Sequence, residues 1–217
     1  MNLQSNPQTG LQIGASGLRF YPGYFSRDAQ LAVLAALRGV LARAPLFTPR
    51  MPKSGRPLSV DMSNCGPLGW ISDERGYRYV ALHPETGASW PAIPDPLLRL
   101  WEDVAHYAEA PEACLINYYG PNAKMGLHQD RDELDFSAPV VSVSLGDSCL
   151  FRVGGGNRRD PTRSFRLNSG DVLVLGGDAR LAFHGVDRIY PETSTLLAEG
   201  GRINVTMRRV TRPQAPA

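Results

Sequence analysis

Long apolar runs are missing from this sequence of 217 residues. No stretch approaches the roughly 18 consecutive apolar residues that a membrane-spanning helix needs. The N-terminal residues MNLQSNPQTG also lack the basic start and the apolar block of a secretory signal. We therefore expect no membrane contact and a cytoplasmic location.

Cysteine is scarce as well, with three residues far apart in the chain: Cys65, Cys114 and Cys149. Their number is odd, and none lies in a CxxC pair, the spacing that suggests bound zinc or redox chemistry. The sequence therefore predicts free, mostly buried thiols.

A strong net charge is also absent. The formal net charge of +2 is too small to indicate a nucleic-acid-binding protein by itself. The charge is unevenly spread, however, because residues 1–60 contain seven basic residues and one acid. This surplus favours a polyanionic partner, and a solvated basic face that binds nothing explains it equally well.

Two packing helices are predicted in the first half of the chain. One is capped by Ser26 and runs to about Arg43. Its apolar face contains Leu31, Leu34, Leu37 and Leu41. The second is capped by Asp95, has Pro96 at its first helical position and ends before Pro111. Its apolar side contains Leu97, Trp101, Val104, Ala105 and Ala108.

The segment between these helices, residues 49–94, is rich in proline and glycine and has no sustained helical or strand period. It carries four aromatic residues: Trp70, Tyr77, Tyr79 and Trp90. We interpret it as an ordered lid or binding loop. A disordered linker is the alternative, and so many aromatic residues argue against it.

From residue 113 onward the pattern changes to short strands. The six strand segments read ACLINYY, PVVSVSL, CLFRV, RSFRL, DVLVL and RINVTMRRV. Strands this short and regularly spaced favour an antiparallel sandwich or barrel. We therefore expect a mainly β protein with flanking helices, of the α+β class, with a jelly-roll core. The length suits a single domain over residues 1–217, with an extension over about 1–110 and the core over about 111–210.

The motif GLHQDRDE places His128 and Asp130 two residues apart, so both side chains leave the same face of an extended chain. His184 is the one histidine downstream of this pair. Two imidazoles and one carboxylate, with other positions open, form the site at which non-heme Fe(II) oxygenases bind co-substrate and O₂. Catalytic zinc uses the same ligand types, so these residues alone do not separate oxidation from hydrolysis.

The last predicted strand, RINVTMRRV, has one polar and one apolar face. Its polar face carries Arg202, Asn204, Thr206 and Arg208. Two arginines inside a sandwich need an anion, and one guanidinium at each end suits a five-carbon diacid such as 2-oxoglutarate. Asn117 and Tyr119 share a face of an earlier strand and offer polar groups to the same ligand. An exposed edge strand is the alternative.

Seven segments in this order resemble the AlkB family of nucleic-acid dealkylases. They are NCGPLGW, GYRY, CLINYY, LHQDRDE, VSVSLG, GDVLVLGGDARLAFHG and RINVTMRR. The resemblance implies a double-stranded β-helix core with an N-terminal helical and nucleotide-recognition lid, and Fe(II) held by His128, Asp130 and His184. The residues implied to contact 2-oxoglutarate are Asn117, Tyr118, Tyr119, Arg202, Asn204 and Arg208.

The same resemblance implies a substrate pocket made of Trp70, Tyr77, Arg78, Tyr79, Asp132 and Arg158. In it Trp70 and Tyr77 look like the aromatic residues that flank a flipped base. Asp132 and Arg158 match positions that contact the base or the nearby nucleotide. Core anchors and surface charges are the alternative interpretations of these residues.

The implied reaction is oxidative demethylation of bases such as 1-methyladenine and 3-methylcytosine with Fe(II), 2-oxoglutarate and O₂. It releases succinate, CO₂ and formaldehyde. We expect a monomer that acts on DNA, as a single strand or a duplex with a flipped base, and RNA stays open. A hydroxylase of a protein side chain or a small metabolite, and a binding module without turnover, are the alternatives.

Two departures from the family pattern leave substrate preference and pocket size open. Residues 50–58, RMPKSGRPL, match least well. Leu175 and Ile203 stand where bacterial relatives carry aromatic residues.

Overall fold

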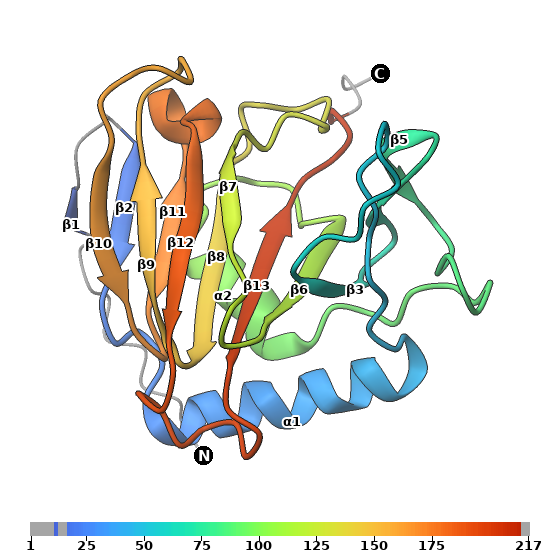
Figure 1. Ribbon diagram of the computed structural model, residues 1–217, viewed down its shortest axis with the longest axis horizontal. Coiled ribbons are helices and arrows are strands. Elements are labelled where there is room, and N and C mark those ends of the chain that lie inside the picture. Colours follow the sequence, from blue (N-terminus) through green and yellow to red (C-terminus); the bar gives the residue numbers. More distant parts are fainter. Residues whose placement is uncertain (1–10, 13–16, 214–217) are drawn as a thin grey trace.

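The computed structural model describes residues 11–12 and 17–213. Two antiparallel sheets face each other, and helix α1 (Arg27–Arg43) lies across one end of the fold (Figure 1). The larger sheet has the order β1-β2-β11-β8-β13-β6-β3. Its strands are Leu11–Gln12, Leu18–Tyr21, Val172–Leu175, Val140–Gly146, Arg202–Arg208, Ala113–Tyr119 and Asp61–Cys65.

The smaller sheet has the order β10-β9-β12-β7. Its strands are Arg163–Leu167, Ser148–Val153, His184–Tyr190 and Met125–His128. A separate hairpin joins β4 (Gly69–Asp73) to β5 (Gly76–Val80), and a short 3-10 helix, η1 (Gly177–Leu181), precedes β12. The expected mainly β architecture with flanking helices is confirmed.

The larger sheet has a core on each face. On one face Ile203, Val205 and Met207 of β13 pack with buried residues of α1 and of α2 (Asp95–Val104). On the other, β11 and β8 share a second core with Phe151 and Val186 of the smaller sheet. The alternation predicted for the last strand is therefore confirmed, because its apolar row faces the helices and its polar row faces the smaller sheet.

Helix α1 confirms most of the first helix prediction. The Ser26 hydroxyl accepts a hydrogen bond from the Ala29 amide, and the helix ends at Arg43. The buried residues are Gln30, Val33, Leu34, Leu37 and Val40. Leu31 is 46% exposed, so its assignment to the packing face was wrong. The inward stripe follows the 3.6-residue period through Gln30, which places Leu31 about 100° away.

Helix α2 differs from its prediction at both ends. Pro94 holds the cap position and Asp95 is the first helical residue, without a side-chain cap bond. The helix ends at Val104, well before Pro111, and His106 has a φ of 53° that interrupts helical geometry. Leu97, Trp101, Val104 and Ala105 are buried as expected, whereas Ala108 is exposed.

Residues 49–94 contain more regular structure than expected, because β3, β4 and β5 all lie there. Strand β3 pairs with β6 in the larger sheet, and β2 pairs with β11. Hence the larger sheet takes strands from both sides of residue 110. Periodicity misses β3 because its buried polar residues find hydrogen-bond partners only in the folded chain: the Ser63 hydroxyl donates to the Ala44 carbonyl, and the Asn64 side chain bonds the Trp70 backbone.

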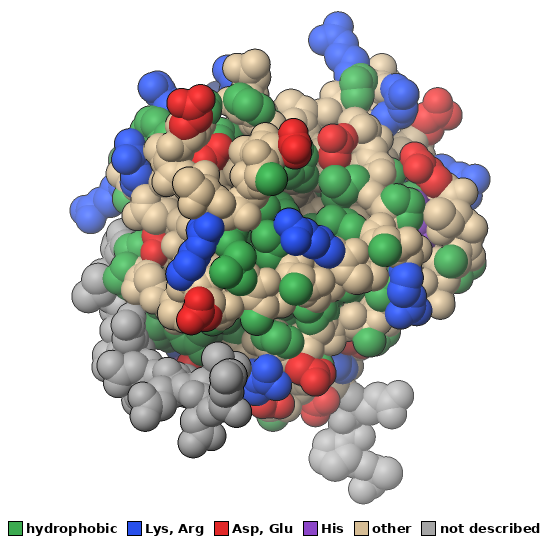
Figure 2. Space-filling model, turned by 90° about the horizontal axis from the view of Figure 1, so that it is seen from below, with side chains coloured by type: hydrophobic (Ala, Val, Ile, Leu, Met, Phe, Trp, Pro, Cys, Tyr) green, Lys and Arg blue, Asp and Glu red, His purple; other side chains and the backbone are tan. Residues whose placement is uncertain are grey.

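The six strands predicted after residue 112 are all present, whereas β7 and β12 escaped prediction. All three cysteines are free and buried, as expected. Seen from the side of α1, basic and acidic side chains are interspersed (Figure 2). Among the residues that the structure describes, no helix combines the length and apolar character needed to span a membrane.

Candidate active site

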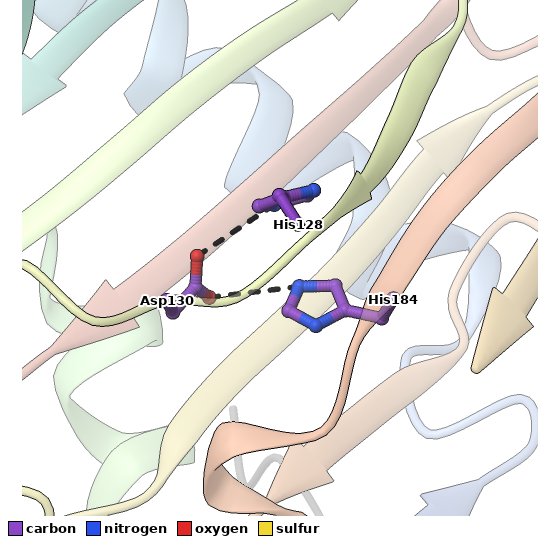
Figure 3. Close-up of side chains that lie close together, drawn as sticks. All are labelled: His128, Asp130 and His184. Atoms are coloured by element: carbon purple, nitrogen blue, oxygen red, sulfur yellow. Dashed lines mark ion pairs between the residues drawn. The ribbon is translucent and has the colours of Figure 1, made fainter. Parts of the chain in front are cut away.

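His128, Asp130 and His184 meet at one end of the smaller sheet. His128 ends β7 and His184 begins β12, and the two residues are direct cross-strand partners. Such partners project to the same face, so the two imidazoles come together. Asp130 follows β7 and turns toward them, with each histidine Nε2 3.7 Å from one of its carboxylate oxygens (Figure 3). One potential ligand atom from each residue lies within 4.8 Å of the others.

Backbone carbonyls orient both imidazoles. His128 Nδ1 lies 3.0 Å from the Gly126 oxygen, and His184 Nδ1 lies 2.9 Å from the Ala182 oxygen. A carbonyl only accepts, so in each ring Nδ1 donates this hydrogen bond and Nε2 is the nitrogen that faces Asp130. Burial, followed by the charge of His128, lowers the pKa of His184 to about 4. His184 is therefore neutral at pH 7, the form that binds a metal.

Asp130 is buried and ionised. Burial alone would raise the pKa of its carboxyl, but Arg208, His184 and His128 hold it well below the usual value. Arg208 Nη2 donates to Asp130 Oδ1 at 2.8 Å. The three residues therefore offer two imidazoles and one carboxylate.

These side chains open into a cavity of about 960 Å³ between the two sheets. The polar row of β13, Asn117, Tyr119 and Ser142 line its inner part. Trp70, Tyr77, Asp132 and Arg158 line its outer part, together with Met51, Pro57 and Leu58 of the segment before β3. One cavity thus contains the three candidate ligands and most of the predicted binding residues.

Arg202 lies inside the cavity with unused donors. Its side chain is 1% exposed, its Nη2 donates to the Ser144 hydroxyl at 2.8 Å, and its guanidinium lies 5.1 Å from the Tyr119 ring centroid. Its Nε and Nη1, and the Asn117 Oδ1, have no partner among the described residues. Buried unpaired guanidinium donors are costly, so a carboxylate entering here would be well held.

Arg208 differs from expectation. The two-arginine argument assumed that both guanidiniums need an external anion, but Arg208 already pairs with Asp130 and, through Nη1 at 3.0 Å, with Glu133. Only its Nε lacks a partner in the described part of the chain. Burial alone would lower the pKa of Arg208, yet Asp130, Tyr79 and Glu133 raise it well above its usual value.

Comparison with known proteins agrees with this geometry. The model of the 2OG-Fe(II) oxygenase superfamily matches residues 17–208. The chain is 53% identical over 193 residues to an "Alpha-ketoglutarate-dependent dioxygenase AlkB homolog" of Caulobacter vibrioides, which covers 89% of this chain and 87% of that protein. It is 39% identical over 206 residues to "Alpha-ketoglutarate-dependent dioxygenase AlkB" of Escherichia coli, covering 93% of each. The chain belongs to the AlkB family.

A solved AlkB-family structure agrees as well. The structure of OsALKBH1 superposes with a TM-score of 0.77 at 32% identity and covers 91% of this chain and 99% of its own. As a member of the AlkB family, the chain is a dioxygenase that uses Fe(II), 2-oxoglutarate and O₂. Its residues fit these groups, because the three ligand atoms leave open positions toward the cavity and Arg202 has donors for a carboxylate.

Trp70 and Tyr77, the two aromatic residues predicted to lie beside a flipped base, form a stacked pair. The Trp70 and Tyr77 rings lie 5.5 Å apart between centroids at an interplanar angle of 16°, already in stacking contact. The two residues predicted to flank a flipped base therefore stack on each other in this conformation. Trp70 Nε1 donates to Asp132 Oδ2 at 2.8 Å, which ties this pair to the loop after the metal ligands.

Three of the binding residues that the resemblance to the AlkB family implies do not line the cavity. Arg78 pairs with Asp73 at 2.7 Å within the β4–β5 hairpin. Tyr79 bonds Glu133 and Arg208 through its hydroxyl, and burial first, with Glu133, raises its pKa well above the usual value. Tyr118 packs against the core under the helices, because neighbours on a strand face opposite ways. Arg158 does line the cavity and donates to the Leu127 carbonyl at 2.8 Å.

The structure separates Leu175 from Ile203, the two positions at which bacterial relatives carry aromatic residues. Leu175 lines the cavity, whereas Ile203 lies in the core on the other face of the sheet. Leu175 and, within residues 50–58, Met51, Pro57 and Leu58 line the cavity and can alter pocket size directly, whereas Ile203 cannot. Glu133 and Arg180, which surround Asp130 and Arg208, were missed by the sequence prediction, since nothing in LHQDRDE or GGDARL indicates that these charges are buried.

Proposed function

We propose that this protein oxidatively removes methyl and other alkyl groups from nucleic-acid bases, with His128, Asp130 and His184 as the iron ligands. The observation that carries the proposal is the joint location, in one cavity, of these three residues, the unpaired donors of Arg202 and the Trp70–Tyr77 pair. Related proteins named as DNA and tRNA demethylases support a nucleic-acid substrate.

Each part of the cavity has a task in this reaction. Arg202, Tyr119 and Asn117 would hold the far carboxylate of 2-oxoglutarate, and Asn204 and Arg208 would contact the co-substrate nearer the candidate iron ligands. Burial raises the pKa of Tyr119 to about 12, so its hydroxyl stays protonated and donates to the carboxylate. When bound, Fe(II) with 2-oxoglutarate and O₂ supplies the oxidising power that hydroxylates the alkyl carbon and yields succinate and CO₂. The hydroxymethylated base then releases formaldehyde.

The outer cavity suits an extruded base. A base must leave the stack before its alkyl group can reach an iron, and flat aromatic surfaces compensate for the lost stacking. The Trp70–Tyr77 pair offers such a surface, and Asp132 lies beside it to accept a hydrogen bond from an exocyclic amine. Lys124, Arg131 and Arg158 line the same cavity and suit flanking phosphates.

We further propose that residues 1–217 act as one catalytic unit, as a monomer in the cytoplasm. The substrate is a base in single-stranded DNA or flipped from a duplex, with RNA as a second polymer to be tested. Exposed Arg50, Lys53 and Arg56 precede β3 and would add phosphate contacts that set affinity rather than base choice.

Formaldehyde release tests this proposal. The purified protein is incubated with Fe(II), 2-oxoglutarate and oligonucleotides that carry 1-methyladenine, 3-methylcytosine or etheno adducts, as DNA and as RNA. We expect formaldehyde with the methylated strands and none with the unmodified ones. Succinate formation that no modified strand accelerates would instead favour a hydroxylase of a protein or small metabolite.

The Trp70→Ala variant is expected to have a kcat/KM for methylated oligonucleotides about 10- to 100-fold lower than the wild type, because base–aromatic stacking contributes about 1–3 kcal/mol per base. Uncoupled conversion of 2-oxoglutarate should stay near the wild-type rate. Trp70→Phe is the matched control, since it keeps a ring and loses the bond to Asp132. Equal loss of both activities in Trp70→Ala would indicate a structural role.

A further inference from the structure

A buried network of four charges lies behind the candidate iron site. Asp130, Glu133, Arg180 and Arg208 are each at most 7% exposed. Arg208 comes from β13, Arg180 from η1 and the two acids from the loop after β7. Two cations and two anions balance one another, as buried charges must. The established chemistry of the site does not by itself explain Glu133 and Arg180.

Glu133 occupies one of the donor groups of Arg208. Its Oε1 accepts from Arg208 Nη1 at 3.0 Å and from the Tyr79 hydroxyl, and its Oε2 accepts from Arg180 Nη2 at 3.1 Å. A guanidinium left alone beside a carboxylate prefers to grip both oxygens with its planar fork. Arg208 Nη1 is taken by Glu133 and by the Tyr79 hydroxyl, and Arg208 donates to Asp130 through Nη2 alone.

The result is a divided Asp130 carboxylate. Its Oδ1 accepts from Arg208, while Oδ2 faces His184 Nε2 at 3.7 Å and is not used by Arg208. Oδ2 is therefore the oxygen free for a metal.

Arg180 binds the backbone of Asp130. Its Nη1 donates to the Asp130 carbonyl at 2.6 Å and its Nε to the Ala138 carbonyl at 2.9 Å. The Phe136 ring lies 5.4 Å from its guanidinium carbon and covers it from solvent. Asp130 is thus fixed at its main chain by Arg180 and at its side chain by Arg208, and Glu133 joins the two arginines.

We infer that Glu133 is a positioning residue for the iron ligand Asp130: it keeps Arg208 on one carboxylate oxygen and leaves the other for the metal. Arg180 and Tyr79 anchor Glu133 in this position. The inference rests on the proposed function only through the assignment of Asp130 as a ligand. Without the Glu133 charge, the network gains a net positive charge beside a divalent cation, and Arg208 is free to close on both oxygens of Asp130.

Metal affinity tests this role without any nucleic acid. Mn(II) serves as the probe, with free Mn(II) followed by electron paramagnetic resonance in the wild type and in Glu133→Gln. The amide keeps the size of the side chain and removes its charge. We expect Mn(II) affinity to fall about 10- to 100-fold, the range for loss of a group that orients a metal ligand.

Glu112→Gln is the matched control. Glu112 is a partly buried acid that pairs with Arg209 at 3.4 Å and accepts from the Val210 and Thr211 amides, and it does not line the cavity. This variant should lose stability in thermal unfolding and keep wild-type Mn(II) affinity. A purely structural role for Glu133 would give the same pattern in Glu133→Gln and would overturn the inference.

Tyr79→Phe decides the matter if Glu133→Gln does not fold. It removes only the hydroxyl shared by Glu133 and Arg208, so Mn(II) affinity should fall roughly 2- to 10-fold, as for the loss of one hydrogen bond. Wild-type affinity in folded Tyr79→Phe would then overturn the inference. Failure of the wild type to bind Mn(II) would overturn the ligand assignment, whereas Mn(II) binding without formaldehyde release would count against the nucleic-acid substrate alone.

Discussion

Replacement of Asp130 by alanine is expected to abolish turnover while the fold survives. The variant removes the one carboxylate among the three clustered ligands and leaves Fe(II) with two imidazoles. Loss of an outer-shell partner alone already lowers metal affinity or activity about 10- to 100-fold, so loss of a direct ligand should exceed that range. Succinate and formaldehyde formation with saturating Fe(II) provide the measurement, and circular dichroism checks the fold.

Two further variants make this result specific. Asp130→Asn keeps the size of the side chain and an oxygen for Arg208 Nη2 but removes the charge, so loss of turnover in this variant too would show that the charge itself is needed. Asp187→Ala is the control, because Asp187 pairs with Arg152 at 2.9 Å, is partly exposed and does not line the cavity. It should retain activity. Full turnover in a folded Asp130→Ala protein would refute the ligand assignment.

Arg202→Ala should chiefly raise the requirement for 2-oxoglutarate. Arg202 is buried, and its Nε and Nη1 have no partner within residues 17–213; each hydrogen bond to a charged group contributes about 1.5–3 kcal/mol. Because 1.4 kcal/mol corresponds to a tenfold change, the KM for 2-oxoglutarate should rise roughly 10- to 100-fold or more. The KM for the methylated oligonucleotide should change little. Initial rates across a 2-oxoglutarate series measure both.

Arg202→Lys distinguishes charge from geometry. Lysine keeps the positive charge and lacks the planar fork, so its effect should fall between those of the wild type and Arg202→Ala. An unchanged 2-oxoglutarate requirement in Arg202→Ala would remove this residue from the co-substrate site. Arg208 is a poorer choice for this test, because its replacement also strips a partner from Asp130 and from Glu133.

Many of the candidate site residues could be predicted from the sequence, because the patterns that indicate them involve residues close together in the chain. The two-residue spacing of His128 and Asp130 and the alternation of β13 each depend on near neighbours, and strand geometry turns them into shared faces. His184 followed as the one histidine downstream of this pair, and the resemblance to the AlkB family implied the same third ligand. Helix α1 could likewise be predicted from its N-cap residue, Ser26, and from the helical spacing of its apolar residues.

Properties that depend on distant partners were not readable in this way. Strand β3 looked irregular because its polar residues are satisfied by Ala44 and Trp70, which only the folded chain brings close. Tyr79 was assigned to the substrate, yet its hydroxyl donates to Glu133, which lies 54 positions further along the chain. The Trp70–Tyr77 contact likewise depends on the pairing of two strands.

The sequence by itself therefore determined the chemistry of this protein: which side chains could bind iron and a diacid, and which strands would carry them. Only the tertiary structure decided how the charges are shared, with Arg202 left open for an anion and Arg208 held by Asp130 and Glu133. The physical reason is that the sequence gives each side chain's chemical type, and the alternation of neighbouring residues gives its strand face. Its burial and its electrostatic partners depend on distant residues: Glu133 and Asp130 lie 75 and 78 positions from Arg208.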